Sequence, residues 1–265
     1  MHTWAVAFLC HLILLSFAAT ATPAERFPFV IPGDDVARTA TDFSHLVSSP
    51  AGAEGFVTIR DGHLYTGDRR LRIWGMNVCF GANAPDKSIA PVIAARLAKL
   101  GINAVRFHHH DSQPPPRGLL RPPENGVRRL DPEMLDRQDF FLDQLHRHGI
   151  YANLNLHVGR TFTEAEGFEN AKNLPYECRY AKYVLYFEPR MRRLLKEFIR
   201  EYLGHVNPYR GVRRAEDPAV ALIEITNENA FSERGPALVR QLPDPYRSEF
   251  RRQFNEWLVR KYQTT

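Results

Sequence analysis

Polar side chains capable of chemistry end the segment "AVALIEITNENAF", which covers residues 219–231. An apolar and β-branched run is followed there by Asn227, Glu228 and Asn229. A turn favours Asn or Gly for its backbone, but it has no need of a carboxylate between two amides. A carboxyl group can give or take a proton in a reaction, and amides can hydrogen-bond a polar substrate. The segment therefore predicts a chemical site at the end of a strand.

Three earlier strand-like segments, "LRIWGMNV", "INAVRFHHHD" and "IYANLNLHV", also end in polar residues. In chain order these are Asn77; Arg106, His108, His109, His110 and Asp111; Asn155 and His157. Together with residues 227–229 they make a set in which one carboxylate of catalytic type, Glu228, is surrounded by amides, imidazoles and a guanidinium. This set suits glycoside cleavage, in which one carboxyl group protonates the leaving oxygen and a second attacks the sugar or activates water.

The elements that must position these residues alternate between strand and helix. Asp61-Gly62 and Gly67-Asp68 predict the turns of an amino-terminal hairpin, and "LRIWGMNV" then reads as a buried strand. Helices are expected at 86–101 with Asp86 as cap, from Asp131-Pro132 to Gly149, and at 188–204. A last helix, about 246–262, has one apolar side formed by Phe250, Phe254, Trp257 and Leu258.

Alternating strands and helices predict an α/β fold with a parallel sheet. Long loops after the second and third strands favour a (β/α)₈ TIM barrel, whose function lies on the loops at the carboxyl ends of the strands. A doubly wound open sheet is the alternative, but the glycine-rich phosphate turn typical of it is absent after the first strand. Only four barrel strands are predicted in the 265 residues. We therefore expect a barrel truncated to about its first four βα units, as the amino-terminal part of a longer protein.

Four segments resemble the clan A glycoside hydrolases, the clan of the cellulase-like family 5 enzymes. "EITNEN" is similar to the Asn-Glu signature of strand four, "AVRFHHHD" to the Arg segment of strand two, and "NLNLHV" to the His segment of strand three. "LRIWGMNV" resembles the entry strand. The resemblance runs from about residue 55 to residue 231. It implies hydrolysis of O-glycosidic bonds in a β-linked polysaccharide or oligosaccharide by a retaining mechanism, with no cofactor.

The resemblance also implies a role for each matched residue. Glu228 would be the general acid/base, and Asn227 would hold the sugar 2-hydroxyl. Arg106 would lie near the nucleophile and keep it ionised, because a nearby cation lowers a carboxyl pKa. His157 would line the site, and His108 and His109 would bind substrate.

The second carboxylate of the clan stands at the end of strand seven, which this chain does not provide. Glu224 lies four residues before Glu228, or about 13 Å along an extended strand, and is too deep to replace it. The chain is therefore expected to hold the acid/base half of the site. A catalytically silent carbohydrate-binding fragment or scaffold on the same fold is the alternative.

The run "HHHD" also raises a metal-dependent hydrolase that uses His108 and His110. Imidazole and carboxylate suit zinc, but three consecutive residues at a strand end point in different directions, so at most two could share one ion. The sequence contains no His-Glu-x-x-His and no Cys-x-x-Cys motif. Substrate binding is therefore favoured, and no metal is expected.

The amino terminus has the pattern of an exported protein. Residues 1–21 contain no Lys, Arg, Asp or Glu, the run 4–19 is apolar, and Ala19-Thr20-Ala21 fits a cleavage site. We expect a signal peptide at 1–21, a leader at 22–54 and the barrel segment at 55–265, in a secreted or periplasmic protein. A membrane anchor is the alternative, but the apolar run is short and His11 interrupts it.

Composition and cysteines bound the remaining possibilities. The net charge is +5, but the arginines are scattered and no nucleic-acid-binding motif occurs, so a carbohydrate is the expected partner and nucleic acid is not. After cleavage, Cys79 and Cys178 remain. Export would permit a disulfide between them, and buried thiols are equally compatible with the sequence.

Overall fold

The computed structural model describes residues 32–35, 37–178, 180–230 and 235–263. It divides the chain into two compact units, residues 1–35 and 36–265. All helices and strands described below belong to the second unit. The expected signal peptide, residues 1–21, lies outside the described residues.

The centre of the second unit is a four-stranded sheet. Its strands are β4 (Gly75–Cys79), β5 (Ala104–His108), β6 (Tyr151–Asn155) and β9 (Val220–Glu224). They run parallel and lie in this order, so each strand pairs with the next one expected from the sequence. The parallel α/β arrangement is confirmed. In the described residues β4 and β9 are the two edges of the sheet, and no barrel is closed.

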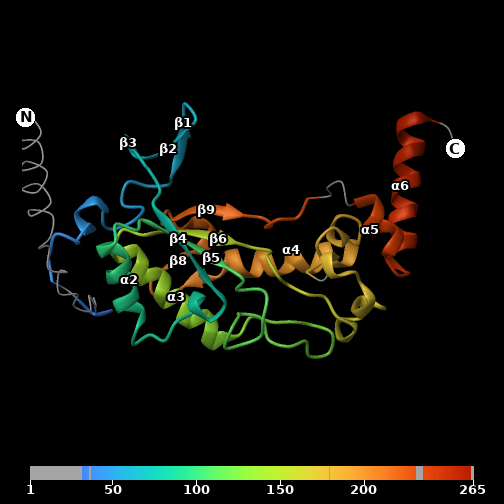
Figure 1. The fold of residues 1–265 in the computed structure, drawn as a ribbon, viewed down its shortest axis with the longest axis horizontal. Coiled ribbons are helices and arrows are strands. Elements are labelled where there is room, and N and C mark those ends of the chain that lie inside the picture. The colour runs from blue at the N-terminus through green and yellow to red at the C-terminus, as the bar shows by residue number, and fades with distance from the viewer. Residues whose placement is uncertain (1–31, 36, 179, 231–234, 264–265) are drawn as a thin grey trace, which may run out of the picture. The chain divides into compact units, whose positions relative to one another are not determined.

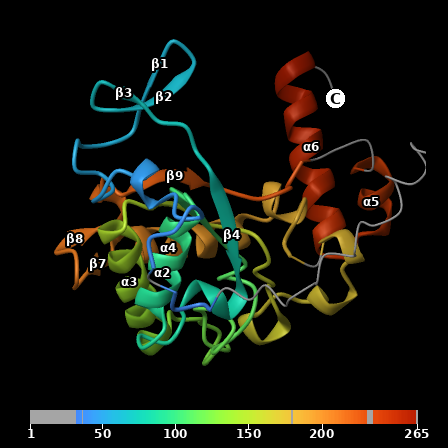
Figure 2. The ribbon, with the colours of Figure 1, turned by 60° about the vertical axis from the view of Figure 1, so that its left-hand side comes forward.

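The described part of this unit contains five α-helices (Figures 1 and 2): α2 (Ala90–Lys99), α3 (Pro132–Arg147), α4 (Pro189–Gly204), α5 (Gly235–Gln241) and α6 (Tyr246–Tyr262). The predicted start of α3 is confirmed, because the Asp131 carboxylate accepts a hydrogen bond from the Met134 amide and Pro132 is the first helical residue.

The main hydrophobic core lies between the sheet and its helices. Val105 and Phe107 of β5 and Leu154 of β6 are fully buried together with Phe141 of α3 and Met191 of α4. These strand residues alternate with polar ones, so the opposite face of the sheet carries the polar side chains. The strands therefore bury their apolar face and direct their chemistry to the other.

The first and last strands differ from the sequence prediction. "LRIWGMNV" is not a buried strand: β4 begins only at Gly75, and Gly75, Met76 and Asn77 are exposed because β4 is a sheet edge. At the other edge, β9 ends at Glu224, so the backbone has left the ladder before it reaches Asn227.

One helix prediction is corrected, and the helix predicted at about 246–262 is confirmed as α6. Asp86 is not the side-chain cap of α2, because the cap residue is Ile89 and the Asp86 carboxylate pairs with Arg137 instead. The apolar side of α6 is largely exposed, with Phe254 at 47% and Trp257 at 43%. Among the described residues, the ring contact between this helix and the rest of the unit is made by Phe250 on Phe187.

The predicted amino-terminal hairpin is confirmed and extends to a third strand. β1 (Thr58–Arg60) and β2 (His63–Thr66) meet at Asp61-Gly62, and β3 (Arg69–Arg70) follows the Gly67-Asp68 turn. A small second core of Ala51, Ala104, Tyr151 and Ala219 lies at the amino ends of the parallel strands. The Tyr151 hydroxyl bonds Thr66 of β2 at 3.2 Å, so this sheet covers the end opposite the candidate site.

Short elements fill the connections. A two-stranded ribbon follows α4, formed by β7 (Val206–Asn207) and β8 (Val212–Arg213). The 3₁₀ turns are η1 (Ser44–Leu46), η2 (Phe80–Asn83), η3 (Glu164–Glu166), η4 (Ala171–Asn173), η5 (Tyr176–Cys178), η6 (Val184–Tyr186) and η7 (Arg214–Glu216). Four of them, η3 to η6, lie in the long loop between β6 and α4, which the sequence left without elements.

Both cysteines that remain after the expected cleavage lie in the described residues. Cys79 is half-buried, Cys178 is buried, and both are free thiols, so the disulfide is not formed here. None of the described helices combines the length and hydropathy required to cross a bilayer.

A buried ion pair joins α3 to the connection before β9. The Asp139 carboxylate accepts hydrogen bonds from Arg214 and from His205, each at 2.6 Å. The side chains of Asp139 and Arg214 are each only 1% exposed, so water could not solvate the charge left behind if one partner were removed. This connection leads directly into β9, and the ion pair therefore helps to fix the strand that carries Glu224.

We expect Asp139→Asn to lower the free energy of unfolding by about 3–5 kcal/mol, because it leaves the Arg214 charge buried without its partner. The measurement is urea denaturation at neutral pH. Glu133→Gln on the same helix is the matched control, since Glu133 is 79% exposed where it pairs with Arg137, and it should change stability by less than about 0.5 kcal/mol. Equal effects of the two substitutions would contradict the assignment.

Candidate active site

The polar face of the sheet is organised by an ion pair between β5 and β9. Arg106 donates from Nε and from one terminal nitrogen to the two oxygens of Glu224, both at 2.6 Å. The side chains are 25% and 30% exposed, so the pair faces the open side of the sheet. A two-pronged contact of this kind fixes the guanidinium plane and the carboxylate plane together.

Two amides of β6 complete the shell of Glu224. Asn153 and Asn155 each donate to one carboxylate oxygen at 2.8 Å. Glu224 lies opposite Asn155 in the strand register, and Arg106 lies opposite Asn153, so all four groups belong to neighbouring rungs. The Arg106 hydrogen bond is the main reason that the pKa of Glu224 lies below its usual range.

Asn227 is held by the same arginine. Its side-chain oxygen accepts from Arg106 at 2.9 Å, and its backbone amide donates to the His157 carbonyl at 2.8 Å. Because its oxygen faces Arg106, its amide nitrogen is available to donate outward. The structure thus brings the predicted strand-two and strand-four residues Arg106 and Asn227 into direct contact.

Glu228 follows on the exposed side of this network. Its backbone has φ of +47°, a left-handed conformation that costs a non-glycine residue about 1 kcal/mol. The next residue holds this turn in place, because the Asn229 side-chain oxygen accepts from the Tyr183 amide at 2.9 Å and its carbonyl accepts from the Tyr186 hydroxyl. The backbone is therefore bent so that a carboxylate is presented to solvent beside a fixed amide.

His108 and His109 lie next to the ion pair. His108 is buried, with Nδ1 3.3 Å from the amide nitrogen of Asn155, and burial lowers its pKa to about 4. His109 is half-buried, with its ring stacked on Phe80 at 4.7 Å and against His108 at 4.1 Å. Burial lowers the pKa of His109 as well, so both imidazoles are neutral at neutral pH and can serve as hydrogen-bonding groups.

His157 is placed differently from the role that the resemblance implies. It is fully buried, and its ring nitrogens contact the Thr226 hydroxyl and the Tyr180 carbonyl, both at 2.9 Å. Both nitrogens are therefore used within the protein. In this geometry His157 ties the strand-four tail to the long loop and does not face the open side of the sheet.

The last two residues of "HHHD" have separate positions. His110 is fully buried against the Tyr202 ring of α4, whereas Asp111 accepts hydrogen bonds from the backbone amides of residues 158–160 at 2.8 to 3.2 Å. Asp111 therefore anchors the loop after β6. Among the described residues, no group of three His, Cys, Asp or Glu side chains could hold a metal ion.

Lys182 is a neighbour of Glu228 that sequence reasoning missed. It comes from the long loop, is only 8% exposed, and within the described structure its ammonium has no hydrogen-bond partner. Burial lowers its pKa, while the charges of Asp111 and Glu228 act in the opposite direction. No short motif marks this lysine, because an irregular loop brings it to the site.

The Glu224 network, by contrast, does leave a signal in the sequence. Polar residues recur at every second position of two consecutive strands, Arg106 and His108 in β5 and Asn153 and Asn155 in β6. Because alternate residues share a face, this pattern marks a polar face whose groups must satisfy one another. The carboxylate at Glu224 is the complementary partner of that pattern.

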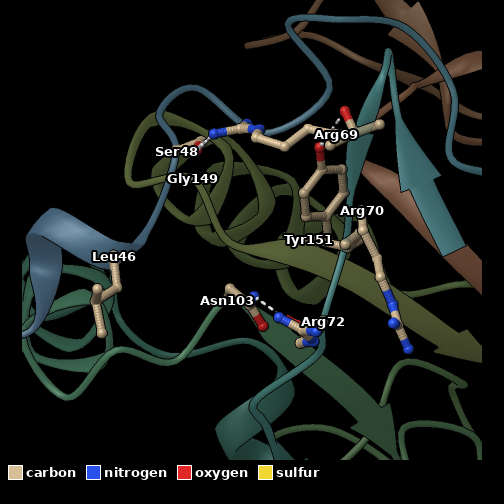
Figure 3. A pocket seen from close by; sticks show the side chains of 10 residues that line it. Leu46, Ser48, Arg69, Arg70, Arg72, Asn103, Gly149 and Tyr151 are labelled. Carbon is tan, nitrogen blue, oxygen red and sulfur yellow. Dashed lines mark hydrogen bonds between the residues drawn. The ribbon is translucent and has the colours of Figure 1, made fainter.

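Two hollows among the described residues do not include Glu228 in their lining. A shallow one of about 340 Å³ on the polar face includes Asn77, Arg106, Asn153 and Leu222 in its lining. A more enclosed one of about 220 Å³ lies at the amino ends of the strands, between Leu46, Tyr151 and several arginines (Figure 3). The first adjoins the ion pair, and the second is at the opposite end of the sheet.

Comparison with solved structures agrees with this architecture. An endo-1,4-beta-mannanase from Rhizomucor miehei superimposes with a TM-score of 0.54 at 17% identity, over 66% of this chain and 48% of that one. A Glycoside Hydrolase Family 5 mannosidase from the same organism, in complex with mannosyl-fructose, gives 0.51 at 17% identity over 70% and 53%. The chain thus spans about half the length of these proteins. At this identity the likeness establishes the fold. No protein-family model and no curated protein matches the sequence.

The ion pair predicts a pH-dependent contribution to stability. Because the pKa of Glu224 is below its ordinary 4.5, the pair stabilises the fold above that pH and its contribution is lost as pH falls through the folded-state value. We expect Arg106→Met to destabilise the protein at pH 6, and the difference from wild type to shrink at pH 3. Urea denaturation at both pH values measures this. A difference that is the same at both would contradict it.

Proposed function

We propose that this chain is the acid/base half of a retaining glycoside hydrolase acting on a β-linked polysaccharide. The observation that carries the proposal is the contact between Arg106 and Asn227, which unites two strand ends beside an exposed carboxylate, Glu228. The similar solved structures support a carbohydrate as substrate, since they are named as a mannanase and a mannosidase. A β-1,4-mannan is therefore the first substrate to test, followed by a β-1,4-glucan.

In this proposal Glu228 protonates the glycosidic oxygen as the bond to the anomeric carbon breaks, and later takes a proton from water. Asn227 donates from its amide nitrogen to the sugar hydroxyl next to the anomeric carbon, in the orientation that Arg106 imposes. His108 and His109 contribute neutral hydrogen-bonding groups at the edge of the sugar. Lys182 is a buried lysine whose charge interacts with that of Glu228.

The nucleophile is the part that we assign elsewhere. A retaining reaction needs two carboxyl groups about 5–5.5 Å apart. Glu224 is unsuited, because its oxygens already accept four hydrogen bonds from Arg106, Asn153 and Asn155. Asp111 is buried and bound to backbone amides. We therefore propose that the second carboxylate comes from further strands that continue the sheet beyond β9, and an open reading frame past residue 265 encoding them would support this.

Because the oxygens of Glu224 and Asp111 are already hydrogen-bonded within the protein, one alternative remains for this chain. It is a catalytically silent carbohydrate-binding fragment. The two are separated by assaying, on β-1,4-mannan, the polypeptide that combines this chain with its second carboxylate. Binding without release of reducing ends favours the silent fragment, and reducing ends that disappear in the Glu228→Gln variant favour hydrolysis. The metal-dependent alternative gains nothing from the positions of His108 and His110, because His108 adjoins Asn155 whereas His110 packs against the Tyr202 ring.

We expect Glu228→Gln to lower kcat for β-1,4-mannan by roughly 10²–10⁴-fold, in the polypeptide that combines this chain with its second carboxylate. For an aryl β-mannoside with a good leaving group, the rate of the glycosylation step should fall much less in this variant, because the leaving oxygen needs little protonation. Measuring both substrates separates proton transfer from a general loss of structure.

Glu216→Gln is the matched control, since this carboxylate is exposed and pairs with Arg213 outside the site. It should keep wild-type kcat on both substrates. Wild-type turnover of mannan by Glu228→Gln would rule out Glu228 as the acid/base.

A further inference from the structure

The enclosed hollow at the amino ends of the strands has an unusual chemical lining. It occupies about 220 Å³ between the amino-terminal segment, the β1–β3 sheet and the beginning of β6. Three of its lining residues, Arg69, Arg70 and Arg72, carry guanidinium groups, and none of its lining residues carries a carboxylate. A cavity with several cations and no anion of its own favours a negatively charged ligand.

Arg69 and Arg72 lie on opposite sides of the opening (Figure 3). Arg69 extends along one side, where it donates to the Ser48 hydroxyl at 2.5 Å. Its other terminal nitrogen is 3.7 Å from Glu54, a long contact that is about half exposed on both sides and therefore weak. The Arg69 guanidinium is thus held in place by a neutral hydroxyl, and its positive charge is not balanced by a strong ion pair. It can therefore pair with an anionic ligand.

Arg72 is fixed through its backbone rather than through its charge. The Arg72 backbone carbonyl accepts a hydrogen bond from the Asn103 side-chain nitrogen at 2.7 Å. The Asn103 side-chain oxygen accepts from the Trp74 backbone amide at 2.8 Å. Within the described structure no carboxylate pairs with the Arg72 guanidinium. Arg70 extends away from the opening, toward His63, where the two side chains are 3.1 Å apart.

The wall between the two arginines is polar and rigid. The Tyr151 hydroxyl donates to the Thr66 hydroxyl, and both residues are more than nine-tenths buried. The hydrogen of the Tyr151 hydroxyl is therefore used internally, whereas the Thr66 hydroxyl keeps its own hydrogen to donate. The site presents fixed hydrogen-bond donors around a space large enough for an oxyanion and a small group attached to it.

We propose that this hollow, defined by Ser48, Thr66, Arg69, Arg72 and Tyr151, is a binding site for an oxyanion carried by a small molecule. Arginine recognises phosphate, sulfate and carboxylate groups alike through paired N–H donors, so the shared chemistry is a compact anion with two or more equivalent oxygens. The site lies at the end of the sheet opposite Glu228, and it stands independently of the proposed hydrolase activity.

The test is isothermal titration of the full chain with inorganic phosphate, sulfate, glucose 6-phosphate and glucuronate, each at the same ionic strength set with chloride. Arg72→Gln removes one cation from an exposed position, so the fold should be kept. Arg60→Gln is the matched control, because this arginine is on the same three-stranded sheet, pairs with Asp68 and does not line the hollow. Thermal unfolding of each variant without ligand checks its fold.

We expect saturable binding of one anion per chain, unchanged in Arg60→Gln and weakened about tenfold or more in Arg72→Gln, since charged hydrogen bonds are lost. Tighter binding of glucuronate than of the phosphates identifies a carboxylated sugar as the source of the anion, and the reverse order identifies a phosphoryl or sulfuryl group. Absence of saturable binding, or an equal effect of the two substitutions, overturns the proposal.

Discussion

The bond between Arg106 and Glu224 is the interaction on which the candidate site depends. It crosses from β5 to β9 over the intervening strand β6, so it forms only when the three strands are in register. The same arginine also fixes the Asn227 amide. The Arg106 guanidinium therefore makes its contacts only when the sheet is correctly assembled, and it also orients the side chain of Asn227, a candidate substrate-binding group.

One face of the sheet contributes to the hydrophobic core, and the other carries the polar groups of the candidate site. Val105, Phe107 and Leu154 point into the core beneath the helices, while the alternating residues form a hydrogen-bonded polar network. A parallel sheet is normally covered on both faces. Here the polar face and the edge strands β4 and β9 remain accessible in the described structure, with Met76 at 42% and Ile225 at 70% exposure. In the proposed function, these edges are where the strands that carry the second carboxylate would pair.

Much of the fold, but less of the site, followed from the sequence. Period-two apolar runs, the Asp131-Pro132 start and the glycines that follow α2 and α3 predicted the elements, because local propensity and burial agree there. The edge position of β4 could not be read, since an apolar strand looks the same at an edge and at a centre. His157 and Lys182 were placed by an irregular loop whose backbone no periodicity describes. Arg106 and Asn227 were found because strand ends meet at one edge.

The hydrogen bonds around Glu224 also constrain how a reaction could proceed. A nucleophilic carboxylate must keep an oxygen lone pair free to attack, whereas the oxygens of Glu224 already accept four donors. Releasing one oxygen would leave Arg106, which also holds Asn227, with part of its charge unpaired. Glu224 is therefore better suited to hold the site than to react in it. In the proposed reaction, the carboxylate that completes the retaining pair would approach from the open face of the sheet, beside the exposed Glu228.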